Sequence, residues 1–87
     1  MTCAMMTSAQ SRAARALLDW SQEQLAAAAH LGVSTIRDFE KGRRVPTHNN
    51  LAGMVAALKG AGVEFIPENG GGAGVRLRHA KKPAHPD

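Results

Sequence analysis

The chain has 87 residues and a formal net charge of +4, with 11 Lys and Arg against 7 Asp and Glu. This length predicts one small domain with a modest core, and the charge permits a nucleic-acid partner without requiring one. The single cysteine, Cys3, excludes an internal disulfide framework and a cysteine-based zinc site. No apolar stretch is long enough to span a membrane and no signal-peptide core follows the first residues, so we expect a cytoplasmic protein.

Residues 1–7 show no periodic pattern, and we expect them to be disordered. Met5 or Met6 is a candidate for the natural start, and the sequence does not decide between them and Met1. A first helix is predicted from Ser8 to about Asp19. Its buried side is expected at Ala9, Ala13, Ala16, Leu17 and Trp20, with Arg12 and Arg15 on the other side or at its border.

Residues 21–42 predict two short helices joined by a tight turn. Ser21 is a good N-cap, and Gln24 three residues later completes a capping box. The alanine-rich stretch that follows has high helix propensity. The apolar face of this first helix of the pair, at helical spacing, consists of Leu25, Ala26 and Ala29.

The second helix of the pair is predicted over residues 33–41, after a turn at residues 30–32. Ile36 and Phe39 face inward at helical spacing. The helix ends at Gly42, because glycine suits the left-handed conformation of a helix C-cap.

This stretch resembles the helix-turn-helix of the Xre/Cro-like repressor family, and the resemblance covers about two thirds of the chain. It implies a lambda-repressor-like domain whose second helix enters the major groove of duplex DNA. The family usually has glycine where this chain has His30, and histidine tolerates positive φ better than most other residues. The matching residues are Ser21, Gln22, Leu25, Ala26, Leu31, Ile36, Phe39, Glu40, Gly42, Arg43, Arg44 and Pro46.

The resemblance also implies which residues face DNA. Arginine can bind guanine through two hydrogen bonds and aspartate can accept one from cytosine, but Arg37 and Asp38 can instead contact phosphate and orient their neighbours. Each of these residues alone can equally be an ordinary solvated side chain. The candidates for reading bases are Val33, Ser34, Arg37 and Asp38, and those for binding phosphate are Gln22, Thr35, Lys41, Arg43, Arg44 and Asn49.

A structural ion pair is implied by the same resemblance. In the family, an arginine at the position of Arg15 pairs with a glutamate at the position of Glu40, and both residues are present here. The pair would lock the first helix to the recognition helix; the alternative is two unpaired surface charges. Removing one partner of such a pair costs ~3–5 kcal/mol when the other charge stays buried.

A further helix is predicted after the loop that ends at Pro46. Thr47 is a plausible N-cap, and the glycines Gly60 and Gly62 end the helix. Its apolar stripe is formed by Leu51, Met54, Val55 and Leu58.

The C-terminal part predicts a β-hairpin where many members of the family have a fifth helix. Two short strands, residues 63–66 and 75–78, flank a glycine-rich loop with the turn signal Asn69-Gly70, and residues 79–87 are expected to be a disordered tail. An isolated hairpin is marginal in water, so it must cap the core or pair with another chain. Its apolar face is supplied by Phe65, with Val63 or Ile66, and by Val75 and Leu77, and these five residues are also the candidates for a dimer contact.

We therefore predict a mainly α, lambda-repressor-like four-helix domain with a C-terminal β-hairpin, which binds double-stranded DNA as a homodimer on a palindromic site and regulates transcription. The alternative is a protein-interaction module, such as an antitoxin or an adaptor that holds another regulator or polymerase through the hairpin edge. No nucleophile motif or carboxylate pair indicates an enzyme, and we expect no catalytic residue, cofactor, metal or membrane partner.

Overall fold

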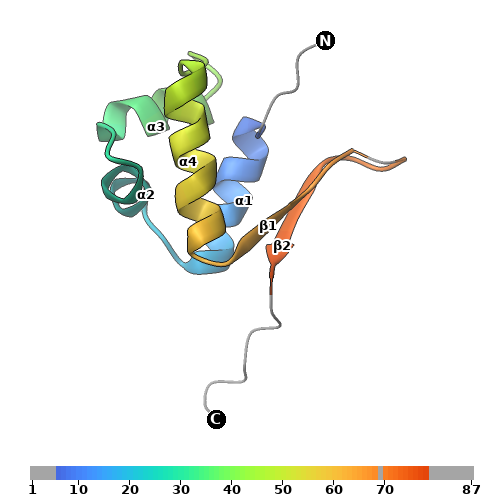
Figure 1. Cartoon of the computed structure of the whole chain (residues 1–87). Coiled ribbons are helices and arrows are strands. Elements are labelled where there is room, and N and C mark those ends of the chain that lie inside the picture. Colours follow the sequence, from blue (N-terminus) through green and yellow to red (C-terminus); the bar gives the residue numbers. More distant parts are fainter. Residues whose placement is uncertain (1–5, 69, 79–87) are drawn as a thin grey trace, which may run out of the picture.

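A computed structural model describes residues 6–68 and 70–78 of the chain, and within them the fold is mainly helical with one hairpin. The second and third helices lie on one side of the fourth, and the hairpin projects from the opposite side (Figure 1). No helix in these ranges is long and apolar enough to cross a membrane. The elements are α1 (Ser8–Leu18), α2 (Gln22–Ala29), α3 (Val33–Glu40), α4 (His48–Gly60), β1 (Val63–Ile66) and β2 (Gly74–Leu77).

Side-chain caps set the starts of three helices. Thr7, Ser21 and Thr47 each accept a hydrogen bond from the backbone N–H three residues later. In return, the backbone N–H of Thr7 donates to Gln10 Oε1 and that of Ser21 to Gln24 Oε1, which completes two capping boxes. The predicted starts of α2 and α4 are thereby confirmed, because a cap satisfies N–H groups that the helix itself cannot.

Two residues in the left-handed conformation bracket α3. His30 ends α2 with a φ of 59°, so the turn has the geometry expected where the family usually has glycine. Gly42 has a φ of 78°, as predicted for the end of the second helix of the pair. Its N–H donates to the Phe39 carbonyl at 3.0 Å, and the Arg43 N–H donates to the Asp38 carbonyl at 2.8 Å. These two bonds form a Schellman motif, which fixes where α3 stops and the basic loop begins.

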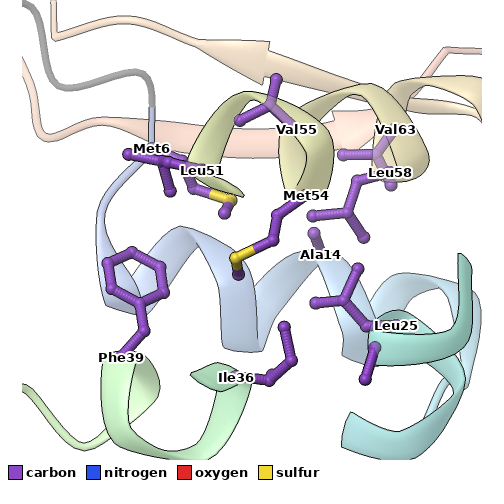
Figure 2. Packing of buried hydrophobic residues seen from close by; sticks show 11 residues of the cluster. Met6, Ala14, Leu25, Ile36, Phe39, Leu51, Met54, Val55, Leu58 and Val63 are labelled. Carbon is purple, nitrogen blue, oxygen red and sulfur yellow. The ribbon is translucent and has the colours of Figure 1, made fainter. Parts of the chain in front are cut away.

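All four helices and β1 contribute to one hydrophobic core. Figure 2 shows the side chain of Met54 extending from α4 toward α3, in the same buried cluster as Ile36 of α3 and Ala14 of α1. The two short helices of the pair are held by Leu25 and Ile36, both fully buried. The predicted apolar stripe of α4 is confirmed, since all of its members are buried: Leu51, Met54, Val55 and Leu58.

The buried side of α1 is not the predicted one, and that prediction was wrong. The helix buries Gln10, Ser11 and Ala14. The two polar side chains have partners inside the fold: Ser11 Oγ donates to Glu40 and Gln10 Nε2 to the carbonyl of Gly74. An alanine pattern is a poor guide here, because alanine gains little from burial. Of the residues expected to be buried, Ala9, Ala13 and Ala16 are exposed, and Leu17 and Trp20 are half-buried.

Residues 6 and 7 belong to the fold, which corrects the expectation that residues 1–7 are disordered. Met6 is 2% exposed and lies beside Leu51 in the core (Figure 2), while Thr7 caps α1. The sequence gives no periodic signal at this point, because the few apolar residues before Thr7 do not recur at helical or strand spacing. Residues 1–5 and the expected tail at 79–87 lie outside the described ranges.

The hairpin caps the core against α1 and α4. Its strands are antiparallel, with Val63 opposite Leu77 and Phe65 opposite Val75, so these four side chains share one face and Ile66 lies on the other. Val63 is fully buried, and Phe65 and Val75 pack against the core. The predicted hairpin is present, although Asn69 of its expected turn lies outside the described residues.

Replacing Met6 with alanine tests the position of this residue. The cavity left in the core should lower the free energy of unfolding by about 2–4 kcal/mol, measured by urea denaturation. Met6→Leu is the matched control and should cost less than about 1.5 kcal/mol, because it nearly conserves volume. Equal stability of Met6→Ala and the unmodified chain would show that Met6 lies outside the core in solution.

Candidate nucleic-acid interface

The outer side of α3 is a polar strip on a firmly anchored helix. Ile36 is fully buried and Phe39 is 7% exposed, so the inner side of α3 is fixed in the core. Among the candidates for base reading, Ser34 and Arg37 are exposed. The other two candidates, Val33 and Asp38, are half-buried. Val33 also packs against the core.

The last residue of α3, Glu40, carries a buried carboxylate that α1 and α2 surround with donors. Arg15 donates from Nη2 to Oε1 at 2.6 Å and from Nε to Oε2 at 2.9 Å. Ser11 Oγ donates to Oε2 at 2.6 Å, and Gln22 Nε2 donates to Oε1 at 3.2 Å. The ion pair between Arg15 and Glu40 is thus two-pronged, and the glutamate side chain is only 2% exposed. We call these four side chains the Glu40 cluster.

The Glu40 cluster keeps its carboxylate ionised. Burial on its own raises the pKa of Glu40, but the hydrogen bonds from Arg15, Ser11 and Gln22, together with the charge of Arg15, hold this pKa below the ordinary value of 4.5. The hydrogen bond to Glu40 likewise raises the pKa of Arg15, and burial opposes it. The ionised pair is therefore the state that the fold stabilises around neutral pH.

Gln22 has a structural partner that sequence reasoning missed. The family resemblance predicts that Gln22 binds phosphate, whereas in the structure its side-chain amide donates one N–H to Glu40. The amide nitrogen carries a second hydrogen, and the side chain is half-buried at the first turn of α2. Gln22 therefore links α2 to α3 before any ligand binds, and has one donor left for an anion.

Basic side chains gather just beyond the C-terminal end of α3. Lys41, Arg43 and Arg44 are exposed, and Pro46 is buried and returns the loop to the domain. Between the arginines and Pro46 lies Val45, which is 79% exposed. Of the remaining phosphate candidates, Thr35 is half-buried on α3 and Asn49 is exposed in the first turn of α4.

A second arginine of α1 also reaches Glu40. Arg12 Nη1 donates to the main-chain carbonyl of Glu40, whereas Arg15 binds its side chain. Sequence analysis left Arg12 unassigned. The available signal is the spacing of Ser11, Arg12 and Arg15, which puts three donors within about one helical turn on one side of α1.

Comparison with known proteins agrees with this geometry. Residues 12–65 match the family model described as Helix-turn-helix, which is more than half of the chain. The matched range begins at Arg12 and ends in β1, so it includes α2, α3 and α4 entire. No curated protein matches the chain. In residues 6–68 and 70–78, no group of three His, Cys, Asp or Glu is arranged to hold a metal ion.

The lowered pKa of Glu40 predicts how the free energy of unfolding depends on pH. A carboxylate whose folded pKa lies below its unfolded pKa adds stability above the unfolded value, and this contribution is lost as pH falls through the folded pKa. Glu40→Gln should therefore lower the free energy of unfolding by about 3 kcal/mol at pH 7, with the difference shrinking below about pH 4.5. Denaturant unfolding from pH 7 down to pH 3 measures it.

The control for this experiment is Glu64→Gln in the hairpin. Glu64 pairs with Arg76 at 2.6 Å, but its side chain is 45% exposed. An exposed pair contributes less than about 1 kcal/mol. Identical pH profiles for the two variants would contradict the role given to Glu40.

Proposed function

The chain belongs to the Cro/C1-type helix-turn-helix family of DNA-binding regulators, and on that premise we propose that it binds duplex DNA at a specific sequence and regulates transcription there. The observation that carries this proposal is the exposed polar strip of α3, held rigidly by a core on its inner side and by the Glu40 cluster at its end. A rigid helix with exposed hydrogen-bonding side chains is what reading a major groove requires.

In this proposal α3 supplies the base contacts. Arg37 is exposed and offers two parallel N–H donors to guanine, and Ser34 is exposed in the first turn, where it can donate or accept. Val33 offers only its outer surface, for instance to a thymine methyl group, because its other side packs against the core. Asp38 is half-buried and can accept from a cytosine amine.

Phosphate contacts flank these base contacts. The exposed cations after α3 face the backbone where the chain leaves the groove, and they supply charge without sequence preference. The second amide hydrogen of Gln22 and the N-terminus of α2 can bind a further phosphate. The proposed phosphate ligands are Gln22, Thr35, Lys41, Arg43, Arg44 and Asn49.

We further propose that two copies pair through the hairpin to bind a palindromic site. The Arg78 N–H donates to the Gly62 carbonyl, so Gly62 and Arg78 form a hydrogen-bonded pair of the antiparallel hairpin. Residue pairs alternate between hydrogen-bonded and non-hydrogen-bonded, so the next pair, Val63 and Leu77, is a non-hydrogen-bonded one. The backbone groups of Val63 and Phe65 on β1 then point away from β2, and such an edge can pair with another strand. Leu77 and Ile66 are half-buried hairpin side chains that are not part of the core packing. The side chains of Val63, Phe65 and Val75 pack in or against the core, so in such a dimer Val63 and Phe65 would contribute backbone groups.

The same edge supports a second candidate, a protein-interaction module. An adaptor or antitoxin would offer β1 or β2 to a strand of another protein. We favour the homodimer because a palindromic site, with half-sites one DNA turn or about 34 Å apart, requires two recognition helices, which a two-fold pair would supply.

Selection from a randomised duplex pool tests the main proposal. The unmodified chain should enrich an inverted repeat. Arg37→Ala should relax one position of each half-site, at a cost of about 1–3 kcal/mol in discrimination, because it removes a base contact. Arg43→Ala should weaken all sequences about equally and reduce the salt dependence, because it removes a phosphate contact. Recovery of no motif, with weak binding that vanishes in salt, would reject sequence-specific reading.

Sedimentation of a hairpin variant tests the dimer. Leu77→Lys should convert a dimer at tens of micromolar into a monomer without unfolding it, because a charge at the edge opposes strand pairing. Ala56→Lys adds the same charge on the exposed side of α4 and should remain dimeric. A monomeric unmodified chain, with and without its selected DNA, would reject the dimer and direct attention to a different protein at the hairpin.

A further inference from the structure

We infer that Arg12 is a positioning residue for DNA reading: from α1 it closes the C-terminal end of α3 and thereby fixes how the reading side chains are presented. This inference rests on the proposed DNA binding by α3. The inference adds to the proposed DNA binding a residue that would contact neither base nor phosphate and would act through its hydrogen bond to α3.

The hydrogen bonds at the end of α3 show what Arg12 contributes. The carbonyls of the last turn need partners from outside the helix, because no further turn follows. The backbone supplies three of them: Lys41 N–H donates to Arg37, Gly42 N–H to Phe39 and Arg43 N–H to Asp38. The next carbonyl, that of Glu40, accepts from Arg12 Nη1. Arg12 therefore completes a cap that the local chain leaves open.

The charge of Arg12 suits this place as well. The C-terminal end of a helix carries partial negative charge, which a cation in the last turn stabilises. Arg37 is the only basic residue of the last turn of α3 itself, and it is exposed and directed to the proposed DNA surface. Arg12 supplies a cation from the opposite side, leaving Arg37 available.

Two arginines of α1 thus hold one residue of α3 by different groups. Arg15 binds the side chain of Glu40, and Arg12 binds its main-chain carbonyl. The contacts of Arg15 fix the carboxylate of Glu40, which several side-chain bonds separate from the backbone of α3. A second contact to the main chain restrains the helix end itself, and Arg37 lies one turn away on the same helix.

A competing assignment is that Arg12 contacts a phosphate directly. Arg12 is exposed, and a guanidinium that donates one hydrogen bond has further N–H groups to offer. The two assignments differ in what they predict. A phosphate contact carries no sequence information and adds to the salt dependence. A positioning contact changes base preference and leaves the salt dependence as it was.

The experiment measures relative affinities for all point variants of the selected site, in the full chain with Arg12→Met. Discrimination at the base pairs that Arg37→Ala identifies should fall by about tenfold, with the slope of log affinity against log salt unchanged. Arg78→Met is the matched control: Arg78 Nη2 donates to the Lys59 carbonyl and so caps α4 in the same way, far from α3. It should leave every base preference unchanged.

A second measurement needs no DNA. Arg12→Met should speed hydrogen exchange of the Lys41, Gly42 and Arg43 amides relative to those of α4, since these three close the end of α3. Arg12→Gln serves in both measurements if Arg12→Met does not fold.

The inference is overturned if base preferences stay the same while all sequences weaken together and the salt slope falls by about 0.9, which is the signature of a phosphate contact. It is also overturned if exchange at the end of α3 is unaffected. A chain that selects no motif at all before any substitution would instead reject the proposed function, and the hydrogen-exchange result would then still decide whether Arg12 holds the helix end.

Discussion

One buried carboxylate organises the arrangement of the first three helices. Taking the charge of Glu40 out of water costs several kcal/mol unless donors replace the lost hydration. Those donors come from Ser11 and Arg15 on α1 and from Gln22 on α2, so the cost is offset only when both helices are in place around α3. The network is therefore directional: it stabilises one relative placement of three helices, and any other placement leaves the carboxylate short of partners.

The hydrophobic core and the Glu40 cluster stabilise the fold in different ways. The core brings the helices together, but burial of apolar area is non-directional and tolerates sliding. Met54 lies in a buried cluster with side chains from several elements (Figure 2), and methionine adapts to irregular space, so it fills the core without fixing how the helices are aligned. The hairpin closes the remaining side through Val63. The hydrogen bonds of the Schellman motif fix the residue at which α3 ends. The hydrogen bond from Arg12 to the Glu40 carbonyl ties this end of α3 to α1.

The sequence predicts those parts whose signal is local. The capping box of α2, the Thr47 cap of α4, the glycine after α3, the stripe of α4 and the hairpin strands all depend on residues within a few positions of one another. It misplaces the buried side of α1, because Ser11 and Gln10 are buried for partners that lie 29 and 64 residues away along the chain. Met6 is missed for a similar reason, since the residues before Thr7 show no period and the burial of Met6 depends on Leu51 and other core residues far along the chain. For the interface, the pattern finds the exposed strip of α3, but the second tie of Gln22 and the contact of Arg12 require the folded geometry.

The separation between reading and holding residues has a consequence for how such a domain can change. Ser34 and Arg37 are exposed and lie outside the core and the Glu40 cluster, so substitutions there affect folding stability little. Ser11, Arg15 and Glu40 allow no such freedom, because removing any one of them leaves a buried polar group short of a partner. The preferred DNA sequence can therefore change through substitutions on the exposed side of α3, while the Glu40 cluster and the core, which together form the platform that holds this helix, stay the same. Gln22 lies at the boundary, because the same amide that ties α2 to Glu40 has its remaining hydrogen available for phosphate. A substitution there alters the platform and the surface together, so its effects on stability and on DNA affinity are expected to be coupled, unlike those at Arg37.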